Sequence, residues 1–159
     1  MERQRIFIDD ILSNENMNRA YKQVIKNKGA AGIDGMECND LLSHLKVNGH
    51  QLRESIRNQS YKPMPVKRVE IPKDNGSKRK LGIPTVTDRM IQQAAAQVLT
   101  PIYEQKFHTN SYGFRPGKSA QQAVLKAAEY MNEGYNWVVD IDLEKFFDTV
   151  EHDKMISIL

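Results

Sequence analysis

The stretch Tyr135–Asp148, which reads YNWVVDIDLEKFFD, constrains the fold of this chain more than any other. It opens on an apolar run of β-forming residues, and a period of two places Ile141 and Leu143 on one face of a strand. Asp140 and Asp142 then lie on the opposite face. Carboxylates opposite the core face of a strand can hold a hard cation such as Mg²⁺, which prefers oxygen ligands. A half-buried strand with solvated acidic side chains fits the same pattern.

The distribution of charge adds a second feature. Residues 61–80 contain seven Lys or Arg against two Asp or Glu, whereas residues 129–153 contain eight acids and one Lys. A basic segment beside an acidic one suits a phosphate-binding surface next to a cation site. Clustering of ordinary surface charges is the simpler alternative.

Residues 66–84 predict a β-hairpin with a basic tip. Two alternating runs flank the turn residues Asp74-Asn75-Gly76, and the second run ends at Pro84. The basic side chains near the tip are those of Lys73, Lys78, Arg79 and Lys80. They either keep an edge hairpin soluble or clamp phosphates, for which Arg offers a bidentate fork and Lys a point charge.

Capping residues and apolar periodicity predict helices on either side of this hairpin. The residues expected to begin or interrupt these helices are Ser13 or Asn14, Gly29, Asn39, Asn48-Gly49, Thr87 and Ser119. The Asn48-Gly49 pair is expected to separate one helix from another at about residues 50–58. Pro101 is expected to kink or end the helix that Thr87 begins.

The segment Asn110–Lys118, NSYGFRPGK, is too rich in glycine and aromatic residues for a regular element. It predicts a glycine-hinged loop that presents Phe114 and Arg115 to a base or a phosphate. Alternatively, Tyr112 and Phe114 pack into the protein and Arg115 pairs with a nearby acid.

The composition is that of a globular chain. Apolar residues make up 40% and charged residues 27% of the 159 residues, enough for one domain with a core. Cys38 is the only cysteine, which excludes an internal disulfide, and no apolar run reaches the length of a membrane span. The N-terminal residues lack the apolar core of a signal peptide. We therefore expect a cytoplasmic protein without a membrane partner.

Several of these segments together resemble the reverse transcriptases of group II introns, which also act as maturases. DIDLEKFFD with the following TVEHDKM resembles the first catalytic motif of that family. The segments Ile71–Ala94, Asn110–Val124 and Gly32–Met36 (GIDGM) match in family order. The resemblance implies an α+β fold, with an N-terminal helical extension over residues 1–60, fingers over 61–134, and the first strand of a truncated palm over 135–159.

The resemblance also implies a catalytic site. The family pattern is an Asp followed five residues on by an aromatic and six residues on by a second Asp, which makes Asp142 the catalytic metal ligand and Phe147 the aromatic. The carbonyl of Leu143 would be a main-chain ligand of Mg²⁺ in a two-metal site. Phe147 would stack under the incoming sugar and favour deoxynucleotides. Asp148 would anchor the turn.

Basic residues carry the remaining roles that the resemblance implies. Nucleotide binding falls to Lys73 and Arg79, which would hold the triphosphate, and to Arg115. Nucleic-acid binding falls to Arg68, which could instead contact the nucleotide, and to Lys78, Lys80 and Arg89. The partners implied are group II intron RNA, an RNA template with a DNA primer, and dNTPs.

One departure from the family limits the activity we expect. The other two catalytic carboxylates of the family lie in a later Tyr-X-Asp-Asp hairpin, and the chain ends at Leu159 before such a motif. We therefore expect that this chain alone does not polymerise and binds RNA weakly at most. The unpaired sheet edge beside Asp142 could join two copies in a homodimer.

The parent enzyme implied is an RNA-directed DNA polymerase of a mobile intron that also aids splicing. Three other functions remain open at this point. The first is an RNA-binding splicing cofactor in which polymerisation is secondary or lost. The second is a reverse transcriptase of a retron, diversity-generating element or CRISPR system. The third is a metal-dependent nuclease, which would leave the basic hairpin and the GFRPG loop without a role.

Overall fold

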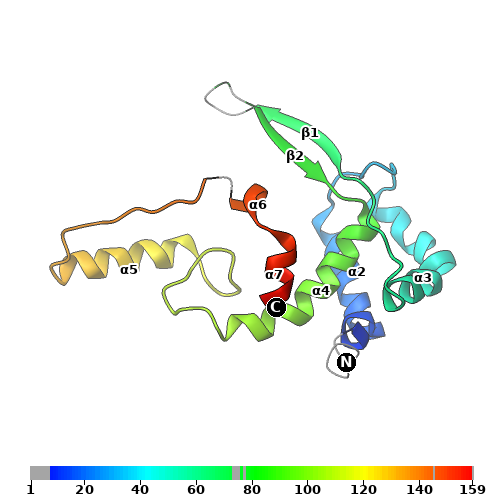
Figure 1. Cartoon of the computed structure of the whole chain (residues 1–159), viewed down its shortest axis with the longest axis horizontal. Coiled ribbons are helices and arrows are strands. Elements are labelled where there is room, and N and C mark those ends of the chain that lie inside the picture. Colours follow the sequence, from blue (N-terminus) through cyan, green and yellow to red (C-terminus); the bar gives the residue numbers. More distant parts are fainter. Residues whose placement is uncertain (1–7, 73–75, 77, 145, 159) are drawn as a thin grey trace. The chain divides into compact units, whose positions relative to one another are not determined.

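The computed structural model describes residues 8–72, 76, 78–144 and 146–158, which form two compact units that divide between Phe107 and His108 (Figure 1). The regular secondary structure of the described residues consists of helices and one small two-stranded sheet, in agreement with the predicted α+β class. The assignment of residues 1–60, 61–134 and 135–159 to extension, fingers and palm stays a prediction. No helix within the described residues is long and apolar enough to cross a membrane.

The first unit contains most of the regular structure. Its labelled elements, in chain order, are α2 (Asn14–Asn27), the 3₁₀ helix η1 (Cys38–Asp40), α3 (Leu41–Arg57), β1 (Lys67–Pro72), β2 (Lys78–Ile83) and α4 (Val86–Glu104). The second unit contains α5 (Ala120–Asn132), α6 (Phe146–Thr149) and α7 (His152–Ile158).

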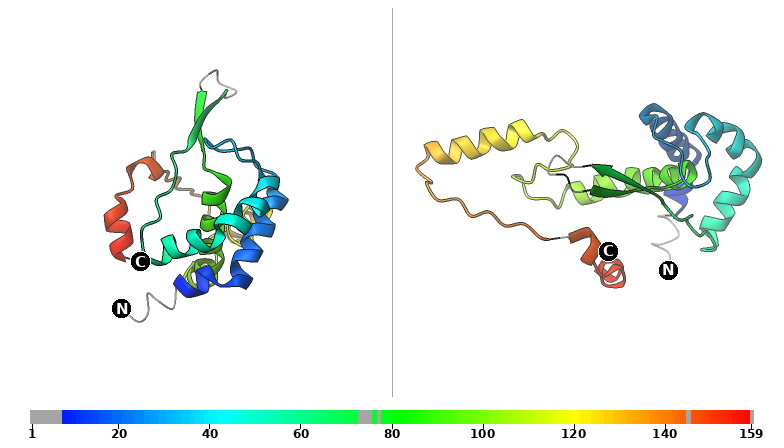
Figure 2. Two further views of the ribbon diagram at one scale, coloured as in Figure 1. Left: turned by 90° about the vertical axis from the view of Figure 1, so that its right-hand side faces the viewer. Right: turned by 90° about the horizontal axis from the view of Figure 1, so that it is seen from above.

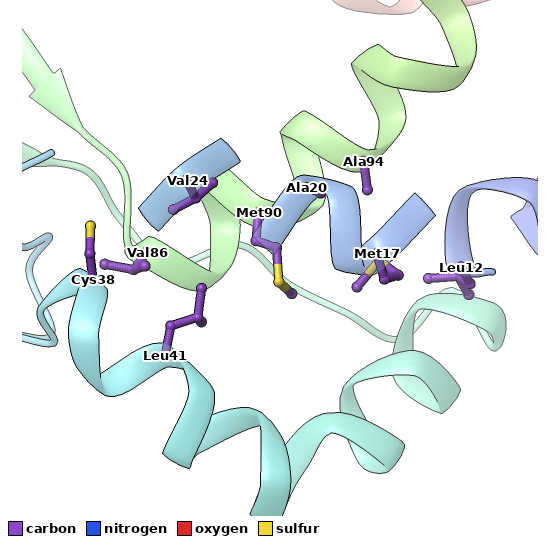
Figure 3. Close-up of a cluster of buried hydrophobic side chains, with 9 residues drawn as sticks. All are labelled: Leu12, Met17, Ala20, Val24, Cys38, Leu41, Val86, Met90 and Ala94. Carbon is purple, nitrogen blue, oxygen red and sulfur yellow. The ribbon is translucent and has the colours of Figure 1, made fainter. Parts of the chain in front are cut away.

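The hydrophobic core of the first unit lies between α2, α3 and α4 (Figure 3). Ala20 on α2 and Ala94 on α4 are fully buried, and their small side chains allow the two helix backbones to approach closely. The buried hydrophobic residues are Leu12, Met17, Ala20, Val24, Cys38, Leu41, Val86, Met90 and Ala94.

A polar contact fixes how α2 and α4 meet. Asn16 is buried, and its Nδ2 atom donates to the carbonyls of Ile11 and Ala94, each at 2.9 Å. In return, Gln97 Nε2 donates to Asn16 Oδ1 at 2.7 Å and to the Asn16 carbonyl at 3.1 Å. Because a buried amide is costly without partners, this pairing specifies one arrangement of the two helices.

The predicted start of the first helix is confirmed. The helix ends one residue earlier than predicted, at Lys28 instead of Gly29. Ser13 caps α2 by accepting a hydrogen bond from the Asn16 amide at 3.3 Å. Lys28, not Gly29, adopts the left-handed conformation that ends the helix, with φ of 47°. Its amide donates to the Ile25 carbonyl at 3.2 Å, which closes the last turn.

Two predicted helix boundaries are wrong. α3 runs without a break through Asn48 and Gly49, because a helical Gly costs only about 1 kcal/mol relative to Ala. Packing of Leu45, Leu52 and Ile56 against the core offsets that cost. Asn39 lies inside η1, which Glu37 caps through a capping box with Asp40.

The start of α4 also differs from the prediction. Thr85, not Thr87, is the capping residue, and its Oγ1 accepts from the Asp88 amide at 3.1 Å. Pro101 does not end the helix, which continues to Glu104. Pro101 lies in the last turns of α4, so little helix remains beyond the hydrogen bond that its missing N–H removes.

The two strands of the predicted hairpin are confirmed, whereas its predicted turn residues Asp74 and Asn75 lie outside the described residues. β1 and β2 pair antiparallel, with Arg68 opposite Gly82, Glu70 opposite Lys80 and Pro72 opposite Lys78. Pairing partners lie on one face, so this register divides the hairpin residues between two faces.

The predicted acidic strand is wrong. Ser119 begins α5 as expected and Gly134 follows it with φ of 98°, but residues 135–143 are extended without strand pairing. Figure 2 shows this segment as an extended connection between α5 and α6. Trp137 is 96% exposed and Val139 82% exposed. A strand needs a neighbour to accept and donate its ladder hydrogen bonds, and within the described residues β1 and β2 pair only with each other.

Candidate functional site

Six consecutive or nearly consecutive residues of the second unit line one hollow of about 670 Å³. They are Ile141, Asp142, Leu143, Phe146, Phe147 and Asp148. The short helix α6 follows the extended segment, and its residues Phe147 and Asp148 line this hollow together with Asp142 and Leu143. The structure therefore gathers the three residues predicted for catalysis and sugar selection, together with a second carboxylate.

The local geometry orients these side chains. Asp142 Oδ1 accepts a hydrogen bond of 3.0 Å from the amide of Leu143, which holds the carboxylate close to its own backbone. Phe146 and Phe147 meet edge to face, with centroids 5.4 Å apart and rings inclined by 64°. Phe147 remains 88% exposed, so its ring is available for contact with another molecule.

The donor set suits Mg²⁺ that arrives with phosphate ligands. No group of three or more His, Cys, Asp or Glu that could hold a metal occurs within the residues the structure describes. Asp142 and Asp148 line the same hollow, and Leu143 offers a main-chain carbonyl there. Mg²⁺ is commonly bound by one or two carboxylates plus waters and substrate phosphates rather than by an all-protein cage. The metal site stays a prediction that these oxygens fit.

The hairpin in the first unit presents most of its basic residues on one face. The register places Arg68, Lys78 and Lys80 together, along with Glu70. Lys78 Nζ lies 2.8 Å from Glu70 Oε2, and both side chains are exposed, so this ion pair adds little stability. The residues predicted to bind nucleic acid on the hairpin therefore share a surface.

Arg79 lies on the other face of the hairpin. It pairs with Ile71, beside the Val69–Leu81 pair. Ile71 is 44% and Leu81 39% exposed, so this face combines a guanidinium with accessible apolar surface. Lys73, the other residue predicted to hold the triphosphate, lies outside the described residues.

Arg89 occupies a structural position. Its Nη2 atom donates to the Ala30 carbonyl at 2.7 Å, and a Cβ atom at Gly29 would collide with its guanidinium. Arg89 thereby fastens the loop after α2 to the first turn of α4. The phosphate contact of Arg89 stays a prediction, and this hydrogen bond occupies part of the guanidinium.

The predicted glycine-hinged loop exposes Phe114 and is held by main-chain contacts of Arg115. Arg115 Nη1 donates to the carbonyls of His108 and Ser111 at 2.7 and 2.8 Å, so the guanidinium braces its own loop. Phe114 has φ of 55° and is fully exposed, which contradicts the alternative in which it packs into the protein. A non-glycine residue with positive φ is uncommon, and here it turns an aromatic ring toward solvent.

A polar cluster that was not predicted from the sequence lies where the hairpin joins α4. Asp88 is buried, and its Oδ1 atom accepts from the Tyr61 hydroxyl at 2.6 Å. Its Oδ2 atom accepts from Thr85 Oγ1 at 2.6 Å and from the Met64 amide at 3.3 Å. We call Tyr61, Met64, Thr85 and Asp88 the hairpin root. The pattern Thr-X-X-Asp at residues 85–88 was the available signal, because a hydroxyl residue three before an acid marks a helix start.

The environment of Tyr61 follows from this cluster. Burial, and then the hydrogen bond to the Asp88 carboxylate and its charge, raise the pKa of the Tyr61 hydroxyl well above its ordinary value. The hydroxyl therefore stays protonated and remains a donor across the physiological range.

Comparison with known proteins agrees with the resemblance seen in the sequence. Residues 71–159 match the family model described as "Reverse transcriptase (RNA-dependent DNA polymerase)". The chain is 38% identical over 148 residues to Protein YkfC of Escherichia coli K12, and 37% identical over 142 residues to the group II intron-encoded protein LtrA of Lactococcus lactis. These matches cover 89% and 88% of the chain but only 39% and 23% of the relatives.

A solved structure shows a similar fold. A chain of a Cas6-RT-Cas1–Cas2 complex matches 94% of this chain with a TM-score of 0.52 and 26% identity, over 15% of its own length. The family model matches more than half of the chain, and the chain is also 37% identical to the group II intron-encoded protein LtrA. The chain thus belongs to the reverse transcriptase (RNA-dependent DNA polymerase) family, among the reverse transcriptases and maturases of group II introns.

Proposed function

We propose that this chain supplies the fingers and the first palm segment of an RNA-directed DNA polymerase of a mobile group II intron. The hollow that holds Asp142, Phe147 and Asp148 carries this proposal, because it combines carboxylates with an exposed aromatic ring. The basic face of the hairpin supports it, since phosphates of nucleotide and nucleic acid need cationic partners.

The residues divide between four tasks in this proposal. Asp142 and the Leu143 carbonyl bind Mg²⁺, and Phe147 contacts the sugar of the incoming dNTP. Bound Mg²⁺ would activate the attacking 3′ hydroxyl and neutralise charge on the phosphates. Arg79 and Lys73 bind the triphosphate, and Arg115 braces the loop that presents Phe114.

Nucleic-acid contacts fall to the other basic side chains. Arg68, Lys78 and Lys80 share one face of the hairpin and bind the phosphates of the RNA template, while Arg89 adds a contact near the start of α4. The partners are intron RNA and an RNA template with its DNA primer. The chain spans less than half the length of the curated relatives it matches, so polymerisation requires carboxylates that those relatives would carry elsewhere in their sequence.

Primer extension on an RNA template tests the proposal. The full product of the gene that encodes this chain should incorporate dNTPs, and Asp142→Ala should abolish incorporation. Asp140→Ala is the matched control, because Asp140 lies in the same exposed segment but does not line the hollow. The 159-residue chain alone should incorporate nothing. Full activity in the Asp142→Ala protein would refute the proposed metal ligand.

Sugar selection gives an independent readout. Phe147→Val should raise the use of ribonucleotides relative to deoxynucleotides, since a smaller side chain leaves space for the 2′ hydroxyl. Phe146→Leu tests whether the neighbouring ring shares that role. If the unchanged gene product does not polymerise and instead binds intron RNA tightly and promotes splicing, the splicing-cofactor function replaces the polymerase.

A further inference from the structure

The chain segments before and after the basic hairpin both donate hydrogen bonds to one side chain, that of Asp88. On the incoming side, the Tyr61 hydroxyl and the Met64 amide donate to the carboxylate of Asp88 at 2.6 and 3.3 Å. On the outgoing side, Thr85 Oγ1 donates to the same carboxylate at 2.6 Å. β1 begins at Lys67 and β2 ends at Ile83, so these contacts lie just outside the two strands.

Helix capping alone does not account for this arrangement. Thr85 Oγ1 accepts a hydrogen bond from the Asp88 amide, which provides the ordinary cap at the start of α4. The Asp88 carboxylate is additionally buried, with 3% of the residue exposed, and takes donors from a segment more than twenty residues earlier. A buried carboxylate is costly unless hydrogen bonds satisfy it, and no basic side chain pairs with it within the described residues. Its two oxygens instead accept hydrogen bonds from residues at both ends of the hairpin, namely Tyr61 and Met64 before β1 and Thr85 after β2.

The first turn of α4 is itself held firmly. Arg89 donates to the Ala30 carbonyl, Gly32 lies against the Thr85 backbone, and Val86 and Met90 are buried in the core. The strands beyond the root are mostly exposed, and each pairs only with the other in the described part of the chain. The direction in which the hairpin points is therefore set at its root.

We propose that Asp88 is a positioning residue that fixes the direction of the basic hairpin relative to the core of the first unit. This inference rests on the proposed function, because the hairpin then carries Arg79 and Arg68 to the nucleotide and the template. If the hydrogen bonds of the hairpin root are lost, Arg79 and Arg68 keep their charges but occupy a wider range of positions. Nucleotide capture then weakens, while the reaction of a bound nucleotide changes little.

Spin-label distances on the chain itself test the positioning. Labels at Leu81→Cys on β2 and Val47→Cys on α3, in a Cys38→Ser background, report the hairpin direction; both sites are exposed. Tyr61→Phe removes one hydroxyl and leaves the cap of α4 in place, and should broaden the distance distribution. Tyr103→Phe on the same helix is the matched control and should leave it unchanged.

Substitutions of the carboxylate sharpen the result. Asp88→Ala should broaden the distribution further than Tyr61→Phe. Asp88→Asn should restore most of the narrow distribution, because its carbonyl can accept from Thr85 and Met64 while its amide donates to the Tyr61 oxygen. Identical distributions for Tyr61→Phe, Asp88→Ala and the unchanged chain would overturn the inference. So would equal broadening by Asp88→Asn and Asp88→Ala.

Kinetics of the full gene product link positioning to function. Tyr61→Phe should raise KM for dNTPs about threefold to tenfold with kcat within about twofold, and Tyr103→Phe should change neither. A broadened distribution with unchanged KM would overturn the link to nucleotide capture. An unchanged gene product without polymerase activity would instead refute the proposed function, and the label distances would still decide whether Asp88 positions the hairpin.

Discussion

Gly32 lies directly against the backbone of Thr85, because a Cβ atom added at Gly32 would stand 2.6 Å from the Thr85 Cα atom. Gly32 is buried, whereas Gly35 in the same GIDGM segment has open space around it and φ of 72°. The two glycines therefore serve different purposes: Gly35 permits a turn, and Gly32 permits the loop to reach the residue that caps α4.

Gly32→Ala should destabilise the first unit. The added methyl group meets backbone atoms rather than a flexible side chain, and overpacking of this kind costs about 1–3 kcal/mol. Gly49→Ala is the opposite control, since its nearest neighbour outside the helix backbone is Leu45 Cβ at 3.9 Å. It should stabilise α3 by about 0.5–1 kcal/mol through helix propensity. Urea unfolding measures both; equal effects of the two substitutions would contradict the close contact.

Asn16→Leu should also destabilise the first unit. The substitution removes both donors to the Ile11 and Ala94 carbonyls and leaves the Gln97 amide without its 2.7 Å partner. Unsatisfied buried groups cost about 1–3 kcal/mol each, so the free energy of unfolding should fall by at least about 2 kcal/mol. Asn18→Leu on the exposed side of α2 is the control and should change it by less than about 0.5 kcal/mol. A gain in stability for Asn16→Leu would show that apolar packing compensates.

The elements that the sequence predicted well depend on short-range patterns. Ser13 and Ser119 cap their helices through amides three residues on, and the hairpin register follows from alternation around one turn. The strand predicted through Ile141 depends on a neighbour elsewhere in space, which alternation cannot supply.

The roles of the basic side chains were predicted from their residue type and from the family resemblance, and neither defines which group a side chain contacts. Arg89 and Arg115 are cationic, but the structure shows their guanidinium groups donating to nearby main-chain carbonyls. Asp88 escaped notice because its partner Tyr61 is distant in sequence and the capping role was assigned to Thr87. Asp142 and Phe147 were predicted from the spacing of the family motif that the sequence resembles, and both line one hollow because they lie close together in the chain.

Stability should fall at high pH through Tyr61. Its pKa is raised in the folded chain, so the folded state holds the proton more tightly than the unfolded state does. The stabilisation is complete below the unfolded tyrosine pKa of about 10 and is lost progressively as the pH rises above it. Tyr61→Phe should therefore lose less stability than the unchanged chain between neutral pH and the alkaline range. Tyr103→Phe corrects for the other groups that titrate there, and an equal decline for both variants would contradict the raised pKa.

Substitutions on the two faces of the hairpin should change different properties of the full gene product, namely RNA binding for one face and KM for dNTPs for the other. Lys80→Ala removes a charge from the face shared with Arg68, so binding to single-stranded RNA should weaken and the slope of log K against log salt should fall by roughly 0.7 to 1. Arg79→Ala acts on the opposite face and should raise KM for dNTPs several-fold with a smaller effect on RNA binding. Filter binding over a salt series and steady-state kinetics measure the two. Equal losses in both assays for both variants would contradict the division by face.

The exposed apolar segment around Val139 should join two copies of this chain at high concentration. Residues 135–143 are extended, their backbone groups have no ladder partner in the described structure, and Val138, Val139 and Ile141 are each more than three-quarters exposed. Such a segment is a template for pairing with another strand, and a second copy supplies an identical one. Light scattering should show a concentration-dependent dimer. Val139→Lys adds charge to the pairing segment and should shift the population to monomer, whereas Val47→Lys on the exposed side of α3 should not. A chain that stays monomeric throughout would contradict this pairing.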